Sequence, residues 1–201
     1  MSMAVFFTAI ISSMLINNIV LFRFLGVCPF LGVSKKTESA LSMSAAVMFV
    51  MMIASIVTYL IYYYVLKPLN IEYVSTIAFI LVIASLVQLV EMFIKKTSKK
   101  LYKSLGIYLP LITTNCAILG VAERNIASNF ATDYGVFQGL LVATTTAFGA
   151  ALGFGLIMFA FSSIRERLDA ANVPPAWKGV PVSLIVAGIM ALAFIGLGGI
   201  V

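Results

Sequence analysis

Long apolar runs, separated by short polar segments that carry most of the charges, dominate the chain. A run of about 20 mostly apolar residues is long enough to cross a bilayer as a helix. Six such runs cover residues 4–22 (continuing less regularly through 25–33), 41–66, 74–94, 105–122, 136–161 and 180–201. No segment between them is long enough to fold alone. The pattern therefore predicts one all-α polytopic membrane domain over residues 1–201, with six transmembrane helices.

Composition supports a membrane class and excludes several others. Of the 201 residues, 62% are hydrophobic and 10% are charged, and the mean hydropathy is +1.12. A soluble domain is typically about 45–50% apolar and about 25% charged, so a soluble domain, a disordered chain and a nucleic-acid-binding protein are all excluded. The chain has no histidine, which removes the commonest general base and the commonest metal ligand.

The charges alternate between the two ends of the expected helices. One set of connecting segments carries 11 basic residues: Arg23, Lys35, Lys36, Lys95, Lys96, Lys99, Lys100, Lys103, Arg165, Arg167 and Lys178. The other set carries only Lys67 and Arg124. Because basic loops stay on the cytoplasmic side, this asymmetry predicts that both termini face away from the cytoplasm.

Two pairs of short matches indicate an internal repeat. Residues 28–33 match residues 116–121 at four of six positions, each hexapeptide beginning with one of the two cysteines, and residues 74–77 match residues 182–185 more weakly. Both matches pair corresponding helices of two halves, residues 1–100 and 101–201. Each half holds three helices, an odd number, so the second half is expected to lie inverted in the membrane.

The first helix of each half is the most interrupted. Pro29 and Pro110 lack a backbone donor and are expected to break helices 1 and 4 near the membrane midplane. Interrupted backbone at corresponding positions of two halves points to a functional site between them. The glycines at 149, 153 and 155 lie inside an apolar run, where they indicate close helix packing, with cofactor binding as the alternative.

Cys28 and Cys116 allow several interpretations. Each cysteine can be interpreted as a small buried hydrophobic residue, as half of a disulfide, or as a metal ligand. Cys28 precedes Pro29 and is expected to cap a new half-helix, while Thr113, Thr114 and Asn115 are cap-forming residues beside Cys116. A helix N-terminus stabilises a thiolate.

An iron–sulfur cluster usually needs four thiolates, so a second protein chain would have to supply two. Zinc is disfavoured because no histidine or nearby carboxylate completes a tetrahedral site.

The residues around these cysteines resemble a known family. The motifs that carry the resemblance are residues 17–18, 23–30, 32–36, 109–117, 165–167 and 173–174. They are similar to the RnfA family, whose members are membrane subunits of the Rnf ion-translocating electron-transport complexes, over nearly the whole chain. A sister family, NqrE of the sodium-translocating NADH:quinone reductase, shares the architecture but lacks the paired asparagines and the Arg-Phe-Leu-Gly start.

The resemblance implies a six-helix subunit that pairs with a homologous subunit of opposite topology, of the RnfE type, in a prokaryotic cell membrane. Each would supply two cysteines, here Cys28 and Cys116, to a shared [2Fe-2S] cluster. The complex would move electrons between ferredoxin and NAD⁺ and transport Na⁺ or H⁺. Sites for nicotinamide, flavin and ferredoxin would belong to the other Rnf subunits, and this chain has no dinucleotide-binding glycine motif after a strand.

Other polar residues inside the expected helices have two interpretations each. Glu91 either pairs with Lys95 one turn on or belongs to an ion path. Arg23 either extends to the cytoplasmic surface or offsets cluster charge. Asn17 and Asn18, like Thr113, Thr114 and Asn115, either cap broken helices or offer oxygen ligands to Na⁺.

A stand-alone secondary transporter is the alternative function. Inverted halves and broken helices suit such a transporter as well. The paired cysteines favour a redox subunit, because transport alone requires no thiolates at repeat-related positions.

Overall fold

All regular structure in the computed structural model is helical over the described residues, which are 3–34, 36–97, 109–128, 135–171, 174 and 177–198. The elements in chain order are α1 (Met3–Ile11), η1 (Ser12–Ile16), α2 (Val27–Val33), α3 (Thr37–Ile61), η2 (Tyr62–Leu66), η3 (Glu72–Val74), α4 (Ser75–Thr97), α6 (Leu109–Thr113), α7 (Cys116–Ala127), α9 (Val136–Asp169) and α10 (Val180–Gly198). Here η1 and η2 are π-helical and η3 is a 3-10 turn. The expected all-α class is confirmed for this part of the chain.

Within the described part of the chain, three helices are long and apolar enough to cross a membrane, namely Thr37–Leu66, Glu72–Met92 and Val136–Asp169. A shorter apolar helix covers Val180–Gly196. These four helices correspond to the predicted runs 41–66, 74–94, 136–161 and 180–201. The remaining two predicted runs are each divided into shorter helices.

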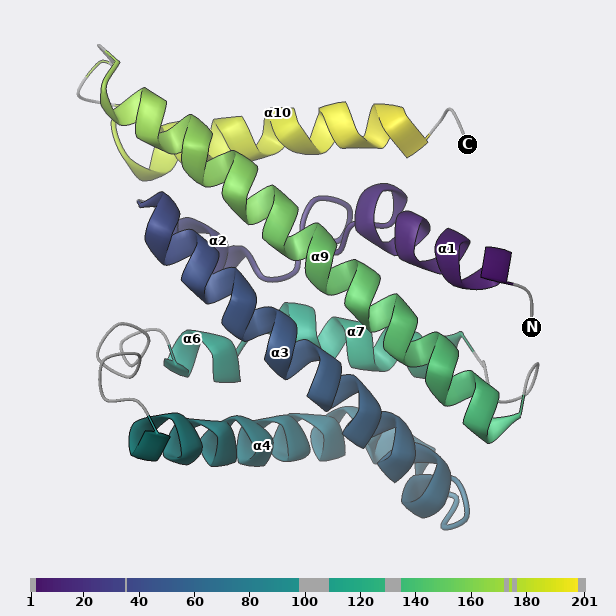
Figure 1. Cartoon of the computed structure of the whole chain (residues 1–201). Coiled ribbons are helices and arrows are strands. Elements are labelled where there is room, and N and C mark those ends of the chain that lie inside the picture. The colour runs from purple at the N-terminus through teal and green to yellow at the C-terminus, as the bar shows by residue number, and fades with distance from the viewer. Residues whose placement is uncertain are drawn as a thin grey trace.

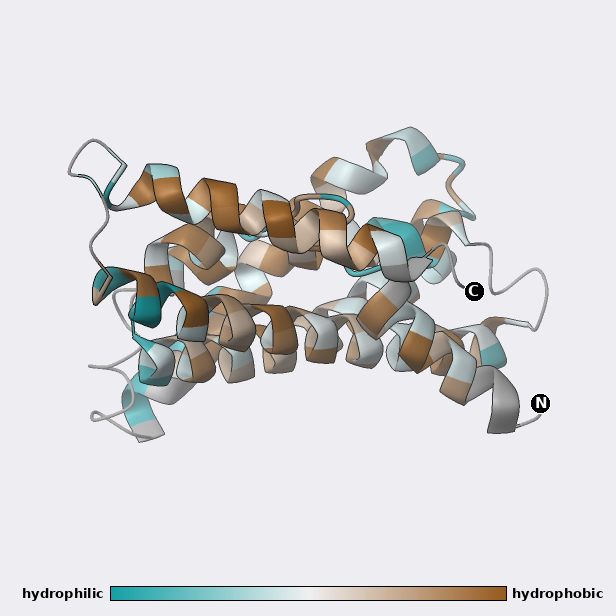
Figure 2. Ribbon diagram, turned by 90° about the horizontal axis from the view of Figure 1, so that it is seen from above, coloured by the Kyte–Doolittle hydropathy of each residue, from teal (hydrophilic) through white to brown (hydrophobic). Residues whose placement is uncertain are grey.

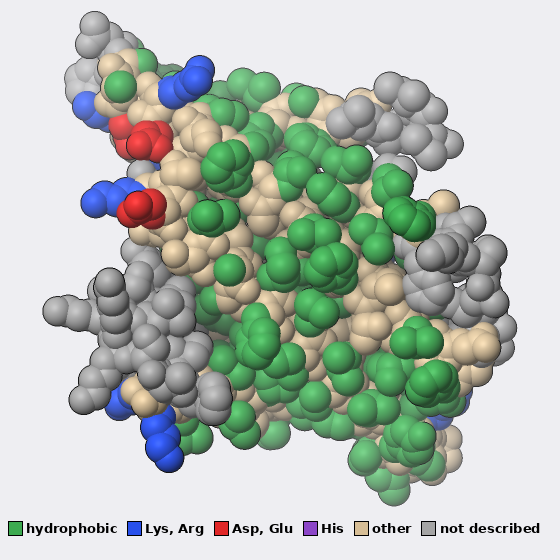
Figure 3. Space-filling model, viewed as in Figure 1, with side chains coloured by type: hydrophobic (Ala, Val, Ile, Leu, Met, Phe, Trp, Pro, Cys, Tyr) green, Lys and Arg blue, Asp and Glu red, His purple; other side chains and the backbone are tan. Residues whose placement is uncertain are grey.

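The two longest helices, α3 and α9, pack against each other through the middle of the molecule (Figure 1). Helix α4 lies on one side of this pair and α10 lies on the other. The short helices lie between α4 and α10 (Figure 1). The start of α1 and the end of α10 lie on the same side of the bundle (Figure 1). Hydrophobic residues follow the helices along their length (Figure 2), and charged side chains gather mainly at the left end of the face seen in Figure 3.

A glycine seam, formed by Gly149 and Gly153 of α9, joins that helix to α1 and η1. A Cβ on Gly149 would lie 2.8 Å from the Ile10 carbonyl oxygen, and one on Gly153 would lie 2.7 Å from that of Met14. Such distances leave no room for a methyl group, so glycine is what lets the two backbones touch. The close-packing interpretation of these two glycines is confirmed. Gly155 faces Ser44 at an ordinary 3.7 Å.

Both interrupted runs are broken in the structure, but not at the prolines. The irregular segment 17–26 separates η1 from α2, and residues 114–115 separate α6 from α7. Pro29 is the third residue of α2 and Pro110 the second of α6. Pro29 therefore follows its break, in the first turn of α2, and Pro110 precedes the break at 114–115 by four residues. The first four backbone N–H groups of a helix have no partner within it, so proline in the first turn costs no hydrogen bond.

Helix α9 continues beyond its predicted end at residue 161, and this places Arg165 inside the protein. Arg165 is only 6% exposed, and its Nη1 donates to the carbonyl oxygen of Leu31 at 2.7 Å and to the Ser34 hydroxyl at 2.9 Å. A cation at the C-terminal end of a helix satisfies free carbonyls and complements the helix dipole. Arg165 therefore holds the end of α2 and is not the free loop charge expected from the sequence.

Replacing Arg165 by methionine is expected to destabilise the protein by about 2–3 kcal/mol, because the buried Leu31 carbonyl and Ser34 hydroxyl lose a charged donor. Denaturant unfolding in detergent measures the effect. Arg167→Met is the matched control: Arg167 is exposed and two residues further along the same helix, so a change within about 0.5 kcal/mol is expected. Equal stability of the two variants would contradict the role given to Arg165.

Candidate functional site

The two cysteine-bearing half-helices begin side by side. Cys28 is the second residue of α2 and Cys116 is the first residue of α7. The backbone N–H of Gly26, immediately before α2, donates to Sγ of Cys116 at 3.4 Å. From this point α2 runs toward one end of the bundle and α7 toward the other (Figure 1). The repeat-related cysteines thus lie at the starts of two half-helices that diverge from one place.

Gly26, and not Cys28, caps α2. Its φ of +81° lies in the left-handed region that favours glycine, and its carbonyl accepts the first helical hydrogen bond, from the Phe30 N–H, at 3.3 Å. The expectation that Cys28 is the cap is wrong by two residues. A left-handed glycine turns the chain sharply, so the helix starts earlier than Pro29 alone suggests.

The start of α7 is capped by a side chain. Asn115 is 4% exposed, and its Oδ1 accepts from the Ala117 N–H at 3.0 Å. The preceding Thr114 donates its hydroxyl to the Pro110 carbonyl at 2.9 Å and so closes the end of α6. Thr114 and Asn115 thus stabilise the break that positions Cys116, as the capping interpretation of these residues requires.

A cavity of about 310 Å³ adjoins Cys116. It lies between α4 and the α6–α7 break, and its lining residues are Ile80, Ile83, Ala84, Thr113, Thr114, Asn115, Cys116 and Leu119. Cys116 is partly exposed and Cys28 is exposed, and both are free thiols. Over the residues described, no three cysteine or carboxylate side chains gather closely enough to bind a metal ion together. The chain has two cysteines in all, Cys28 and Cys116.

Asn17 and Asn18 stabilise the other break. The Asn17 amide donates to the Ser12 hydroxyl at 3.3 Å. Asn18 is 1% exposed, donates to the Met14 carbonyl at 2.9 Å and accepts from the Val20 N–H at 3.1 Å. The paired asparagines therefore supply hydrogen bonds that the interrupted helix cannot form.

Arg23 lies in the irregular segment before α2 and not in the connection between α2 and α3. Its positive charge acts on Arg124, which is in the last turn of α7 and donates to the Asn17 carbonyl at 3.4 Å. Helix α2 separates Arg23 from Lys36, so the assignment of Arg23 to the same segment as Lys35 and Lys36 is wrong. A count of charges cannot detect this, because it does not show that a short helix lies between them.

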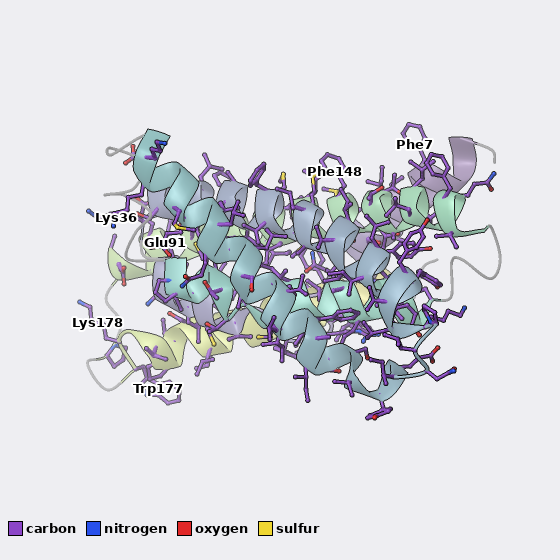
Figure 4. The ribbon with its side chains drawn as sticks, turned by 90° about the horizontal axis from the view of Figure 1, so that it is seen from below. Phe7, Lys36, Glu91, Phe148, Trp177 and Lys178 are labelled. Atoms are coloured by element: carbon purple, nitrogen blue, oxygen red, sulfur yellow. The ribbon has the colours of Figure 1, made fainter. Side chains whose placement is uncertain are left out.

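Glu91 is partly exposed on α4 and lies toward the same end of the bundle as Lys36 and Lys178 (Figure 4). Phe7, near the start of α1, lies at the opposite end (Figure 4). The ion path proposed for Asn17, Asn18 and Glu91 stays a prediction.

Two residues that matter in this region, Gly26 and Arg165, carry little signal in the sequence. Gly26 is one of 14 glycines, and only its position two residues before a cysteine distinguishes it. Arg165 follows the fifth apolar run, which ends at residue 161, so the hydropathy pattern places it in a loop. The role of Arg165 depends on the continuation of the helix past this residue, and the apolar pattern does not predict that continuation.

Together, these helices and their broken central segments define a polytopic α-helical membrane protein with paired cysteines at the start of two half-helices. The family described as "Rnf-Nqr subunit, membrane protein" matches residues 6–201, and the chain belongs to this family.

Curated relatives match over nearly their full length. The chain is 54% identical over 189 residues to the subunit designated A of the Na⁺-translocating ferredoxin:NAD⁺ oxidoreductase complex of Acetobacterium woodii, with 94% of each chain covered. It is 55% identical over 192 residues to the subunit designated A of the ion-translocating oxidoreductase complex of Pasteurella multocida, with 96% of each chain covered. The same subunit of Syntrophotalea carbinolica is 54% identical over 192 residues, covering 96% of this chain and 95% of the relative.

Proposed function

We propose that this chain is the membrane subunit of an ion-translocating ferredoxin:NAD⁺ oxidoreductase, in which Cys28 and Cys116 provide half of the ligands to a [2Fe-2S] cluster. The cluster would carry electrons across the membrane, coupled to translocation of Na⁺ or H⁺. The names of the relatives support the complex and its reaction, and they favour a redox subunit over a stand-alone transporter. The sites for nicotinamide, flavin and ferredoxin belong to other subunits.

The observation that carries the proposal is that the two cysteine-bearing half-helices begin side by side. Gly26, two residues before Cys28, contacts Sγ of Cys116 directly, so the two ligand segments are held against each other. Cysteine thiolates are the usual ligands of iron–sulfur clusters. The residues present therefore fit such a group, which when bound would accept and release one electron at a time.

The other two ligands are proposed to come from a homologous subunit of opposite topology. The segment that leads into α2 supports a covered interface: Phe22 and Phe24 are 55% and 57% exposed, and Arg23 between them is exposed as well. Irregular backbone and charged side chains are tolerated at membrane depth only where protein or a water-filled cavity surrounds them. A partner subunit over this surface would provide those surroundings.

The same proposal includes six membrane crossings, arranged as two inverted halves of three. The corresponding placement of Cys28 and Cys116 at half-helix starts supports the repeat. The excess of basic residues at one end of the bundle supports an orientation with both termini outside the cytoplasm. A reporter fused after Val201 is expected to be active only if it works outside the cytoplasm. Activity of a cytoplasm-specific reporter at that position would contradict the orientation.

Electron paramagnetic resonance of the purified complex tests the cluster. After reduction with dithionite, the complex is expected to show a [2Fe-2S] signal that is missing from a complex purified without this subunit. The isolated chain is expected to hold no stoichiometric iron, because it supplies only two of four thiolates. A stoichiometric cluster in the isolated chain, or identical spectra with and without the subunit, would refute the shared site.

A further inference from the structure

One hydrogen bond links the two halves of the site through the backbone. The Gly26 N–H and the Cys116 sulfur are 90 residues apart in the chain and 3.4 Å apart in space. The donor is a backbone group held at the start of α2, so its position follows the position of that helix. The acceptor is one of the two thiolates proposed above to bind the cluster.

Only glycine permits this approach. A Cβ at position 26 would lie 3.1 Å from the Cβ of Ala117, 3.1 Å from Oδ1 of Asn115 and 3.2 Å from Cε2 of Phe154. Each distance is shorter than ordinary van der Waals contact, and the φ of +81° disfavours a side chain in addition. Any side chain at this position would therefore move the Gly26 N–H away from Cys116.

We propose that the Gly26 backbone N–H donates a hydrogen bond to the Cys116 thiolate in the cluster-bound protein and thereby raises the reduction potential of the cluster. The inference rests on the proposed function. Reduction adds one electron and makes the cluster and its thiolates more negative, so a donor aimed at the sulfur stabilises the reduced form more than the oxidised form. Hydrogen bonds to the sulfurs are among the factors that set such potentials. Gly26 is thus a positioning residue that acts through Cys116.

Potentiometric titration of the complex provides the first test. In Gly26→Ala the midpoint potential is expected to fall by about 59 mV, a tenfold shift in the ratio of reduced to oxidised cluster. Gly32→Ala is the matched control: Gly32 lies in the same short helix, has no φ in the left-handed region, and a Cβ there would meet nothing within 4 Å. Its midpoint is expected to equal that of the unmodified complex. An unchanged midpoint in Gly26→Ala would overturn the inference.

A second measurement needs no substitution in the site. Complex labelled with ¹⁵N-glycine is reduced and studied by pulsed electron paramagnetic resonance, which detects nitrogen coupled to the cluster spin through an N–H···S hydrogen bond. A ¹⁵N coupling is expected in the unmodified complex and in Gly32→Ala. Its absence from the unmodified complex would overturn the inference even if Gly26→Ala fails to assemble. A complex without any cluster signal would instead refute the proposed function itself.

Discussion

Cys28→Ser and Cys116→Ser are each expected to remove the cluster while leaving the chain folded in the membrane. A hydroxyl replaces the thiol with little change in volume, but the iron loses a soft sulfur ligand. The iron bound at this site should fall close to zero in both variants. Electron transfer from ferredoxin to NAD⁺ should fall to the level of a complex that lacks this subunit, while partial reactions on the soluble subunits continue.

Ala84→Ser is the matched control for these variants. Ala84 lines the same cavity as Cys116, so this change adds a hydroxyl beside the site without removing a thiol. Iron and activity are expected to stay at the level of the unmodified complex. If either cysteine variant keeps both its iron and its activity, that cysteine is a small packed side chain and not a ligand.

Gly153→Ala is expected to destabilise the packing of α9 against η1. The added methyl would lie 2.7 Å from the Met14 carbonyl oxygen and 2.8 Å from the Asn18 amide nitrogen. Helix α9 and η1 would have to separate, and overpacking of this kind typically costs about 1–3 kcal/mol. Displacement of Asn18 would also weaken the hydrogen bonds that support the first break. Unfolding by denaturant in detergent, followed by helical circular dichroism, measures the loss.

Gly155→Ala is the control on the same helix. Its Cβ would lie 3.7 Å from the nearest side chain, that of Ser44, which is ordinary contact. Alanine favours helix over glycine by about 1 kcal/mol, so stability should be unchanged or slightly higher. The packing argument fails if the two glycine variants unfold at the same denaturant concentration.

The sequence predicts the helices well because length and apolar content decide whether a segment crosses a bilayer. The runs at 41–66, 74–94, 136–161 and 180–201 each correspond to a helix in the structure. The two interrupted runs are also identified correctly. The positions of their breaks are not, because proline interrupts a helix in its interior, whereas Pro29 occupies the first turn of α2, in which no donor is needed, and the second break lies four residues after Pro110.

Tertiary contacts explain why the rest of the site could not be predicted. Whether Gly26 is left-handed depends on how the chain approaches α7, and no local pattern specifies that approach. Arg165 stays buried because the end of α2 offers it a carbonyl and a hydroxyl. Arg23 is separated from Lys36 by the short helix α2, which the run of apolar residues does not distinguish. For Gly26 and Arg165 the residue type is visible in the sequence, but the partner comes from a distant part of the chain.

The glycine seam also constrains how the protein is made. Gly149 contacts Ile10, and 139 residues of chain separate them. At typical translation rates of about 5–20 residues per second, the first helix emerges from the ribosome roughly 7–28 seconds before its packing partner exists. Until then α1 and η1 lack the helix against which they pack, whereas Asn17 and Asn18 hydrogen-bond to residues at most five positions away and need no later helix. Packing of the first helix therefore waits for the fifth predicted helix to be synthesised.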